Sequence, residues 1–136
     1  MMKYKSNYLL YVLDTGENFK VGIVENRANL NKRFNSLYKQ LAKPTEEARA
    51  KIKFARVYEG AVDRHIKTCE ENLLKKELFE HRLPQANPKG QPTEYFDSHI
   101  TLDMITEAID KQPLFAGGKP VKLNLLYTDY VPNYKK

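Results

Sequence analysis

The sequence predicts an α+β fold, in which helices flank a small, mainly antiparallel sheet of three strands. Three observations lead to this prediction. Two apolar runs, Leu9–Leu13 and Phe19–Val24, flank a turn-forming cluster, Asp14–Asn18, and are typical of a β-hairpin. A third run, Lys53–Tyr58, alternates well enough to add a strand. Apolar residues recur at helical spacing between and after these runs.

Two helices are predicted between the hairpin and the third strand. Asn29 or Asn31 is positioned to cap a helix that runs to about Leu41. A threonine followed by acidic residues, at Thr45, then opens a second short helix toward Lys51.

A long helix is predicted after the third strand, capped by Asp63 and extending to about Arg82. Residues 84–92 contain three prolines and a glycine, which predict a loop. Residues 93–97 form a brief extended piece.

The C-terminal part is predicted to add one helix and an edge strand. Ser98 or Thr101 caps the helix, which continues through Lys111. Gly117 and Gly118 interrupt the chain before a strand at Val121–Tyr127. No domain boundary is evident, so residues 1–136 are predicted to form a single domain.

The composition indicates a folded, basic protein. Hydrophobic residues make up 41% and charged residues 29%, as in ordinary globular proteins. No apolar run approaches the roughly 20 residues needed to cross a bilayer, and no signal-peptide pattern is present. Cys69 is the single cysteine, which excludes an internal disulfide and fits a reducing, cytoplasmic environment. The net charge of +6 favours a polyanionic partner such as nucleic acid.

The hairpin and the helix after it resemble the GIY-YIG nucleases. Leu9-Leu10-Tyr11 stands where that family has its first tripeptide, and Lys20-Val21-Gly22 stands for the second. Arg33, in the sequence KRFNSL, matches the arginine of the family's helix. The segment Gly90–Phe96 resembles the end of the domain in a phage and bacterial branch of this family. The resemblance covers about residues 8–97 and leaves 98–136 as a C-terminal helix and tail.

The resemblance assigns a role to each of the matching side chains. Tyr11 would orient or deprotonate the attacking water, and Lys20 would supply a cation that lowers the pKa of this phenol. Lysine is a departure here, because the family usually has a second tyrosine. Arg33 would contact the phosphate that gains charge during attack, since a guanidinium can donate two hydrogen bonds to it.

A single glutamate would bind the metal ion. The family pattern around it favours Glu70, and Glu71 is the alternative. One carboxylate with water in the remaining positions suits Mg²⁺, with Mn²⁺ as a substitute.

Three further residues are candidates for binding the substrate. Glycine inside a strand is costly unless something approaches the backbone, and at Gly22 this is expected to be the Arg33 helix or DNA. Lys32 and Lys39 would extend the basic helix face along the nucleic acid.

The sequence therefore predicts a metal-dependent DNA endonuclease, of the kind often carried by phages or mobile elements, acting on double-stranded DNA. One site cuts one strand, so a double-strand break requires a homodimer or two successive nicks. The alternatives are a catalytically inactive module that binds nucleic acid, or a protein-binding, inhibitory domain on the same scaffold.

Overall fold

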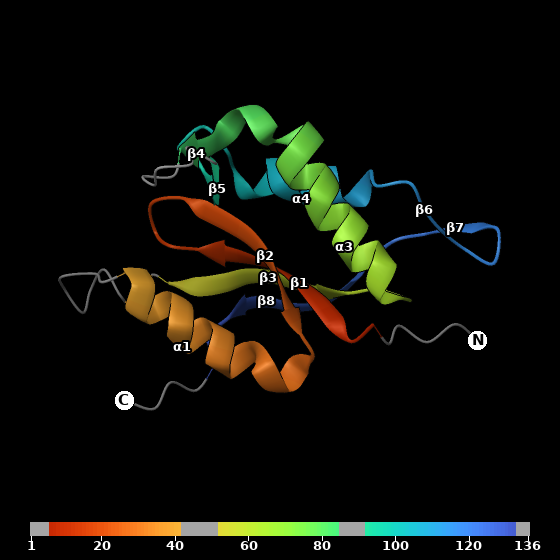
Figure 1. The fold of residues 1–136 in the computed structure, drawn as a ribbon, viewed down its shortest axis with the longest axis horizontal. Helices are drawn as coiled ribbons and strands as arrows, with labels where there is room; N and C mark the ends of the chain where they lie inside the picture. Colours follow the sequence, from red (N-terminus) through yellow and green to blue (C-terminus); the bar gives the residue numbers. More distant parts are fainter. Residues whose placement is uncertain (1–5, 42–51, 85–91, 133–136) are drawn as a thin grey trace.

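The computed structural model describes residues 6–41, 52–84 and 92–132 as an α+β fold (Figure 1). Its helices are α1 (Leu30–Leu41), α3 (Asp63–Asn72) and α4 (Leu102–Asp110). One antiparallel sheet contains six strands: β1 (Tyr8–Asp14), β2 (Phe19–Glu25), β3 (Lys53–Glu59), β4 (Arg82–Pro84), β5 (Pro92–Phe96) and β8 (Asn124–Tyr130). A separate hairpin joins β6 (Leu114–Ala116) to β7 (Lys119–Val121).

The predicted α+β class is confirmed, but the sheet has six strands and not the predicted three. The sheet runs in the order β4-β5-β2-β1-β3-β8, so strands are added on both sides of the predicted three. The added strands β4 and β5 are short. Strand β4 ends at Pro84 and β5 begins at Pro92, and prolines in a sequence are typical of loops. The expected edge strand exists as β8, shifted three residues toward the C-terminus.

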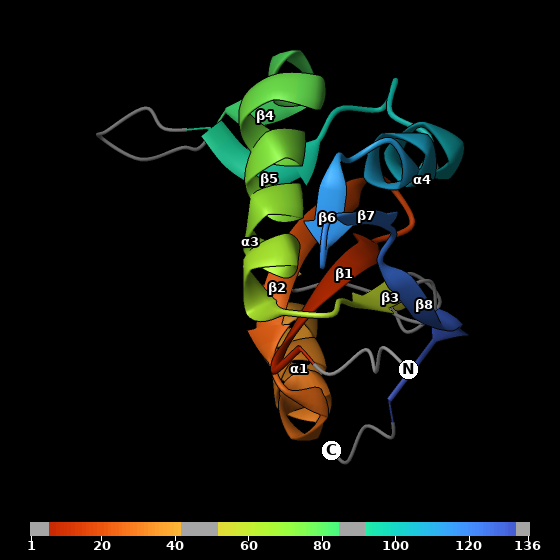
Figure 2. The same cartoon turned by 90° about the vertical axis from the view of Figure 1, so that its right-hand side faces the viewer.

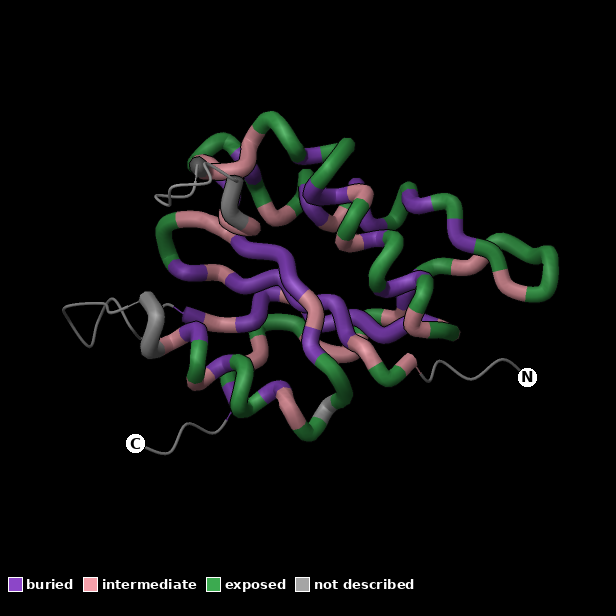
Figure 3. The backbone as a smooth tube through the Cα atoms, in the orientation of Figure 1, coloured by how far each residue is buried: buried purple, intermediate pink, exposed green. Residues whose placement is uncertain are grey.

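Helices cover both faces of the sheet, as Figures 1 and 2 show from two directions. Side chains alternate along β1, so Leu9 and Leu13 pack toward α1, whereas Leu10 and Val12 face α3 and α4. Both faces of β1 are therefore buried, and the buried trace in Figure 3 runs through the central strands.

The hairpin and most helices follow the prediction. Thr15 and Asn18 close the β1–β2 turn, where the Thr15 amide donates to the Asn18 carbonyl at 3.0 Å. Helix α1 begins at Leu30, directly after Asn29. Thr101 caps α4, because its hydroxyl accepts a hydrogen bond from the Met104 amide. The short helix expected after Thr45 lies outside the described residues.

The predicted cap at Asp63 is wrong. Val62 occupies the cap position and no side chain caps the helix. The Asp63 carboxylate instead accepts hydrogen bonds from the amides of Asn7 and Tyr8, at 2.6 and 3.0 Å. A carboxylate in a first helical turn thus joins α3 to the start of β1.

The long helix also ends earlier than predicted. Its α-helical part stops at Asn72, a π-helical turn follows over Leu73–Glu77, and a 3₁₀ turn over Phe79–His81 completes it. The amide of Leu78 donates to the Leu73 carbonyl at 3.0 Å, five residues back. Periodicity alone does not distinguish such a widened turn from α-helix, and π segments are frequent at functional sites.

Gly22 is required by Tyr11 and not by a helix or a bulge. The two residues are paired across β1 and β2 in an unbroken register. A Cβ atom at Gly22 would lie 2.5 Å from Cζ of Tyr11 and still closer to its hydroxyl oxygen. The expectation that the Arg33 helix makes the close approach is therefore corrected, because the phenol ring itself fills this space.

Gly22→Ala is expected to lower the free energy of unfolding by about 1–3 kcal/mol, since the new methyl group displaces a packed ring. The cost should nearly vanish in a Tyr11→Ala background, where the space is empty. Urea unfolding of the two single variants and the double variant measures this coupling. Equal cost of Gly22→Ala in both backgrounds would contradict the packing explanation.

No helix in the described part of the chain is long and apolar enough to cross a membrane.

Candidate functional site

The β-hairpin places Tyr11 and Lys20 on the same face of the sheet. Tyr11 is in the middle of β1, packs its ring against Phe54 with centroids 5.2 Å apart, and is 1% exposed. Lys20, on β2, donates a hydrogen bond from Nζ to the Tyr11 hydroxyl oxygen at 3.3 Å. The register of the hairpin therefore gives the predicted pair direct contact.

Burial decides the protonation of Tyr11. It raises the pKa of the phenol above the usual 10.0, although Lys20 and then Arg33 act to lower it. Lys20 thus has the effect predicted for it, but burial is larger. At neutral pH the hydroxyl is protonated, and its oxygen accepts from Lys20.

Glu94 supplies the negative charge next to Lys20. Its Oε2 atom lies 2.5 Å from Nζ, and the lysine side chain is only 10% exposed. Desolvation lowers the pKa of Lys20, but Tyr11 and Glu94 raise it more, so that the net pKa lies above 10.5. The ammonium also lies 5.7 Å from the centre of the Tyr95 ring. Lys20 is therefore a charged, nearly buried group held between two strands.

Glu70, on α3, interacts electrostatically with both Glu94 and Lys20. Burial raises its pKa to about 7, and the Glu94 carboxylate raises it further, whereas Lys20 and Arg82 oppose the rise. A carboxylate with so strongly raised a pKa is typical of functional sites. Glu70 is half-buried near the Lys20–Glu94 pair.

Glu71 is placed differently. Its side chain is 61% exposed and pairs with Lys75 one turn along the helix, at 3.1 Å. Of the two predicted metal ligands, Glu70 is half-buried and interacts electrostatically with Lys20 and Glu94, whereas Glu71 lies on the surface.

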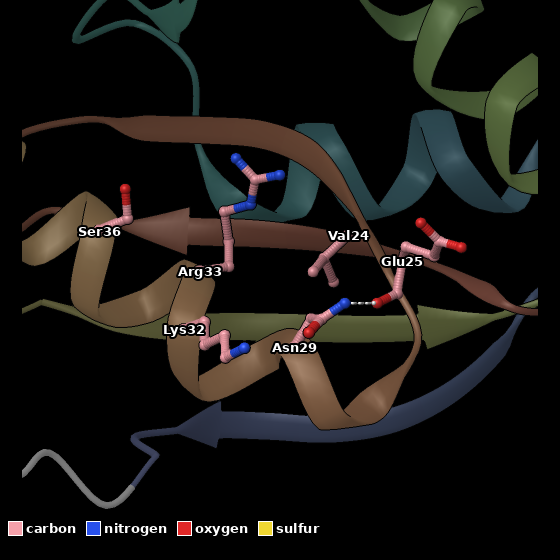
Figure 4. A pocket seen from close by; sticks show the side chains of 6 residues that line it. All are labelled: Val24, Glu25, Asn29, Lys32, Arg33 and Ser36. Carbon is pink, nitrogen blue, oxygen red and sulfur yellow. Dashed lines mark hydrogen bonds between the residues drawn. The ribbon is translucent and has the colours of Figure 1, made fainter.

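Arg33 lies on α1, which packs against the same face of the sheet as Tyr11. It is exposed on α1 and lines a surface pocket of about 320 Å³ together with other residues of β2 and α1, namely Val24, Glu25, Asn29, Lys32 and Ser36. Figure 4 shows the guanidinium extending from α1 toward the hairpin. Its positive charge acts to lower the pKa of Tyr11.

The pocket leaves part of β2 accessible. In the described residues β5 pairs with β2 only at Tyr95 and Lys20. Val24 and Glu25, further along β2, line the pocket instead. The side chains of Arg33 and Lys32 are exposed in this pocket.

The other predicted binding residues differ in position. Lys32 is exposed in the pocket. Gly22 is buried beneath Tyr11, so its backbone is not free for a ligand on that face. Lys39 belongs to α1, but its side chain lies outside the described residues.

Glu94 was missed as a site residue by the sequence analysis. The segment Gly90–Phe96 was matched only to the end of the family's domain, and Glu94 received no role. The observation that could have identified Glu94 is the need of a buried lysine for an opposite charge, but nothing local indicates which of the acidic residues supplies it.

Glu70 is a single carboxylate and not part of a larger group of metal-binding side chains in the described residues. Within the described ranges no three His, Cys, Asp or Glu side chains form a group able to hold a metal. Glu70 offers carboxylate oxygens of the kind that Mg²⁺ prefers, and the charge of Glu94 acts on Glu70. Because Mg²⁺ keeps several water ligands, it requires few protein ligands.

No protein-family model, curated protein or solved structure matches this chain.

Proposed function

We propose that this protein is a metal-dependent endonuclease of the GIY-YIG type that hydrolyses phosphodiester bonds in double-stranded DNA. The observation that carries the proposal is the hydrogen bond between Lys20 and Tyr11, because the charge of Arg33 acts on this tyrosine and the charge of Lys20 acts on Glu70. A hydroxyl, an ammonium, a guanidinium and a carboxylate are a complete set for phosphodiester hydrolysis.

Arg33 and Tyr11 act on the phosphate and on the attacking water. Arg33 holds the phosphate and offsets the charge that develops on it. The oxygen of a water molecule bonds to phosphorus while the bond from phosphorus to the 3′-oxygen breaks. Tyr11 orients this water and, as phenolate, takes its proton, and the 3′-oxygen takes up a proton from solvent.

Glu70 would hold the metal ion. When bound, Mg²⁺ supplies a Lewis acid for the leaving oxygen. The raised pKa of Glu70, about 7, means that the free carboxylate forms only near neutral pH and above. The positive charge of the metal favours this ionised form.

A second function is favoured by the burial of Tyr11, which is 1% exposed. A phenol that water does not reach does no chemistry, and the basic pocket of Arg33 and Lys32 would then serve for binding alone. In this case the protein retains DNA without cutting it. The two functions predict different rates of DNA cleavage but the same affinity for DNA.

Nicking of supercoiled plasmid in Mg²⁺ or Mn²⁺ tests the proposal. The native protein is expected to cut, and Arg33→Ala to lower the rate roughly 100- to 1,000-fold, as loss of a charge-stabilising donor does. Arg64→Ala, which removes an exposed arginine at the start of α3, is the matched control and should cut like the native protein.

DNA retention at increasing salt separates the outcomes. Salt-sensitive retention with no cutting by the native protein would support the binding module. Equal cutting by native protein and Arg33→Ala would overturn the assignment of Arg33. One active site nicks one strand, so double-strand cuts that appear only at high protein concentration would indicate a homodimer.

A further inference from the structure

The nearly buried ammonium of Lys20 requires a nearby negative charge, because burial removes the water that would solvate it. Its ammonium donates to Tyr11 and lies 5.4 Å from the centre of that ring, with Tyr95 on the other side. Aromatic rings attract a cation weakly, and a phenol oxygen carries no charge, so neither compensates for the loss of water around the ammonium. The full opposite charge comes from Glu94, at 2.5 Å.

Glu94 reaches Lys20 from a distant part of the chain. The two residues are 74 positions apart, and they meet where β5 joins β2, next to the pairing of Lys20 with Tyr95. Glu94 itself is 44% exposed along its side chain, so its carboxylate links the buried lysine to the surface.

The consequence concerns the direction of the Tyr11 hydroxyl. An N–H of Lys20 points to the tyrosine oxygen, so the tyrosine proton must point elsewhere. A lysine freed from Glu94 would turn to solvent or to a bound phosphate, and the hydroxyl would lose the contact that orients it. The Lys20–Glu94 ion pair therefore keeps the lysine at the position from which it donates to the Tyr11 oxygen.

We propose that Glu94 is a positioning residue, which holds the Lys20 ammonium against the Tyr11 hydroxyl so that this hydroxyl is presented to the water that attacks the phosphate. The inference deepens the proposed endonuclease function and rests on it. Glu94 touches Lys20 and acts through it on Tyr11.

Glu94→Gln removes the charge and keeps the shape of the side chain. Cleavage of plasmid is expected to fall roughly 10- to 100-fold, the size of effect that follows a small misplacement of a reacting group. Retention of DNA without metal should stay unchanged or become tighter, since a negative charge is lost. Glu80→Gln, at an exposed glutamate, is the matched control for charge. In a Lys20→Met background the effect of Glu94→Gln on cleavage should disappear.

A second readout does not depend on activity. The Nζ protons of a buried, ion-paired lysine exchange slowly with water, so a ¹H–¹⁵N correlation of lysine ammonium groups should show Lys20, assigned by its loss in Lys20→Met. This resonance is expected in the native protein and in Glu80→Gln, and it should be lost in Glu94→Gln.

The outcomes separate the inference from the function on which it rests. Persistence of the Lys20 resonance in Glu94→Gln, or unchanged cleavage by that variant, overturns the positioning role and leaves the nuclease intact. Loss of the Lys20 resonance in Glu94→Gln, together with a native protein that cuts no DNA, supports the contact between Glu94 and Lys20 and overturns the nuclease. A thermal midpoint lowered by many degrees together with weaker DNA retention would indicate a merely structural role, and so would also overturn the inference.

Discussion

Glu70→Gln is expected to stabilise the folded protein while abolishing metal-dependent cleavage. The pKa of Glu70 rises from the usual 4.5 to about 7 on folding, chiefly because burial disfavours its charge. A rise of this size corresponds to roughly 3 kcal/mol at most, and glutamine has no charge to bury. A half-buried site retains some solvent, so a gain of about 1–3 kcal/mol in the free energy of unfolding is expected at pH 8.

The sign follows from the direction of the rise. Below pH 4.5 the carboxyl is protonated in both states, so it has no effect on stability. Between pH 4.5 and about 7 the unfolded chain loses its proton first, and the stability of the native protein declines as pH rises. Above about 7 the full penalty is present. The Glu70→Gln variant lacks this decline.

Urea unfolding of both proteins from pH 4 to 8, in EDTA, measures the difference, and plasmid nicking measures the loss of cutting. Glu71→Gln distinguishes the two candidate ligands. If it abolishes cutting and Glu70→Gln does not, the metal site moves by one residue. A Glu70→Gln protein that is less stable than the native protein at pH 8 would contradict the buried charge.

Tyr11→Phe is expected to reduce cleavage roughly 100- to 10,000-fold, the usual range for removing a group that transfers or directs a proton. The ring and its contact with Phe54 remain in this variant, so the core should change little. Lys20 loses one acceptor but keeps Glu94. Activity should thus fall much more than stability.

The pH dependence of the same reaction separates a base from an orienting group. The pKa of Tyr11 lies above 10.0, because burial outweighs the nearby cations. If the phenolate takes the proton of water, single-turnover cleavage should rise about tenfold per pH unit between pH 7 and 9 without levelling. A flat profile would leave Tyr11 the orienting role alone.

Tyr8→Phe is the matched control for this prediction, because it removes a hydroxyl from the same strand and keeps a ring that lies 4.5 Å from Lys67 Nζ. It should cut like the native protein. A slope that persists in Tyr11→Phe would assign the proton transfer to another group.

The meeting of Tyr11 with Lys20 could be predicted because it depends on local geometry. A turn between two alternating runs sets the register of a hairpin, and the register places both side chains on one face. The position of Gly22 was noticed for the right reason, the close approach of another group. Only the packed structure shows that Tyr11 fills the space at Gly22, because a tyrosine ring can turn to either side of the residue with which it is paired.

The pairing of Glu94 with Lys20 could not be predicted, for a different reason. Glu94 follows a proline-rich segment whose local preferences indicate a loop, and it becomes part of β5 only when β2 offers an edge to pair with. Opposite charges attract at any sequence separation, so sequence does not choose among the acidic residues. The same holds for Glu70 and Glu71, since adjacent positions on a helix differ only in which direction they face.

The sequence by itself therefore determined the α+β class, the β1–β2 hairpin and the positions of most helices, because turn chemistry and apolar periodicity act over a few residues. Only the tertiary structure decided the six-stranded sheet, the burial that keeps Tyr11 protonated, and the ion pair between Lys20 and Glu94. These depend on contacts between segments far apart in the chain and on the exclusion of water from the space between them, which no short stretch of sequence records.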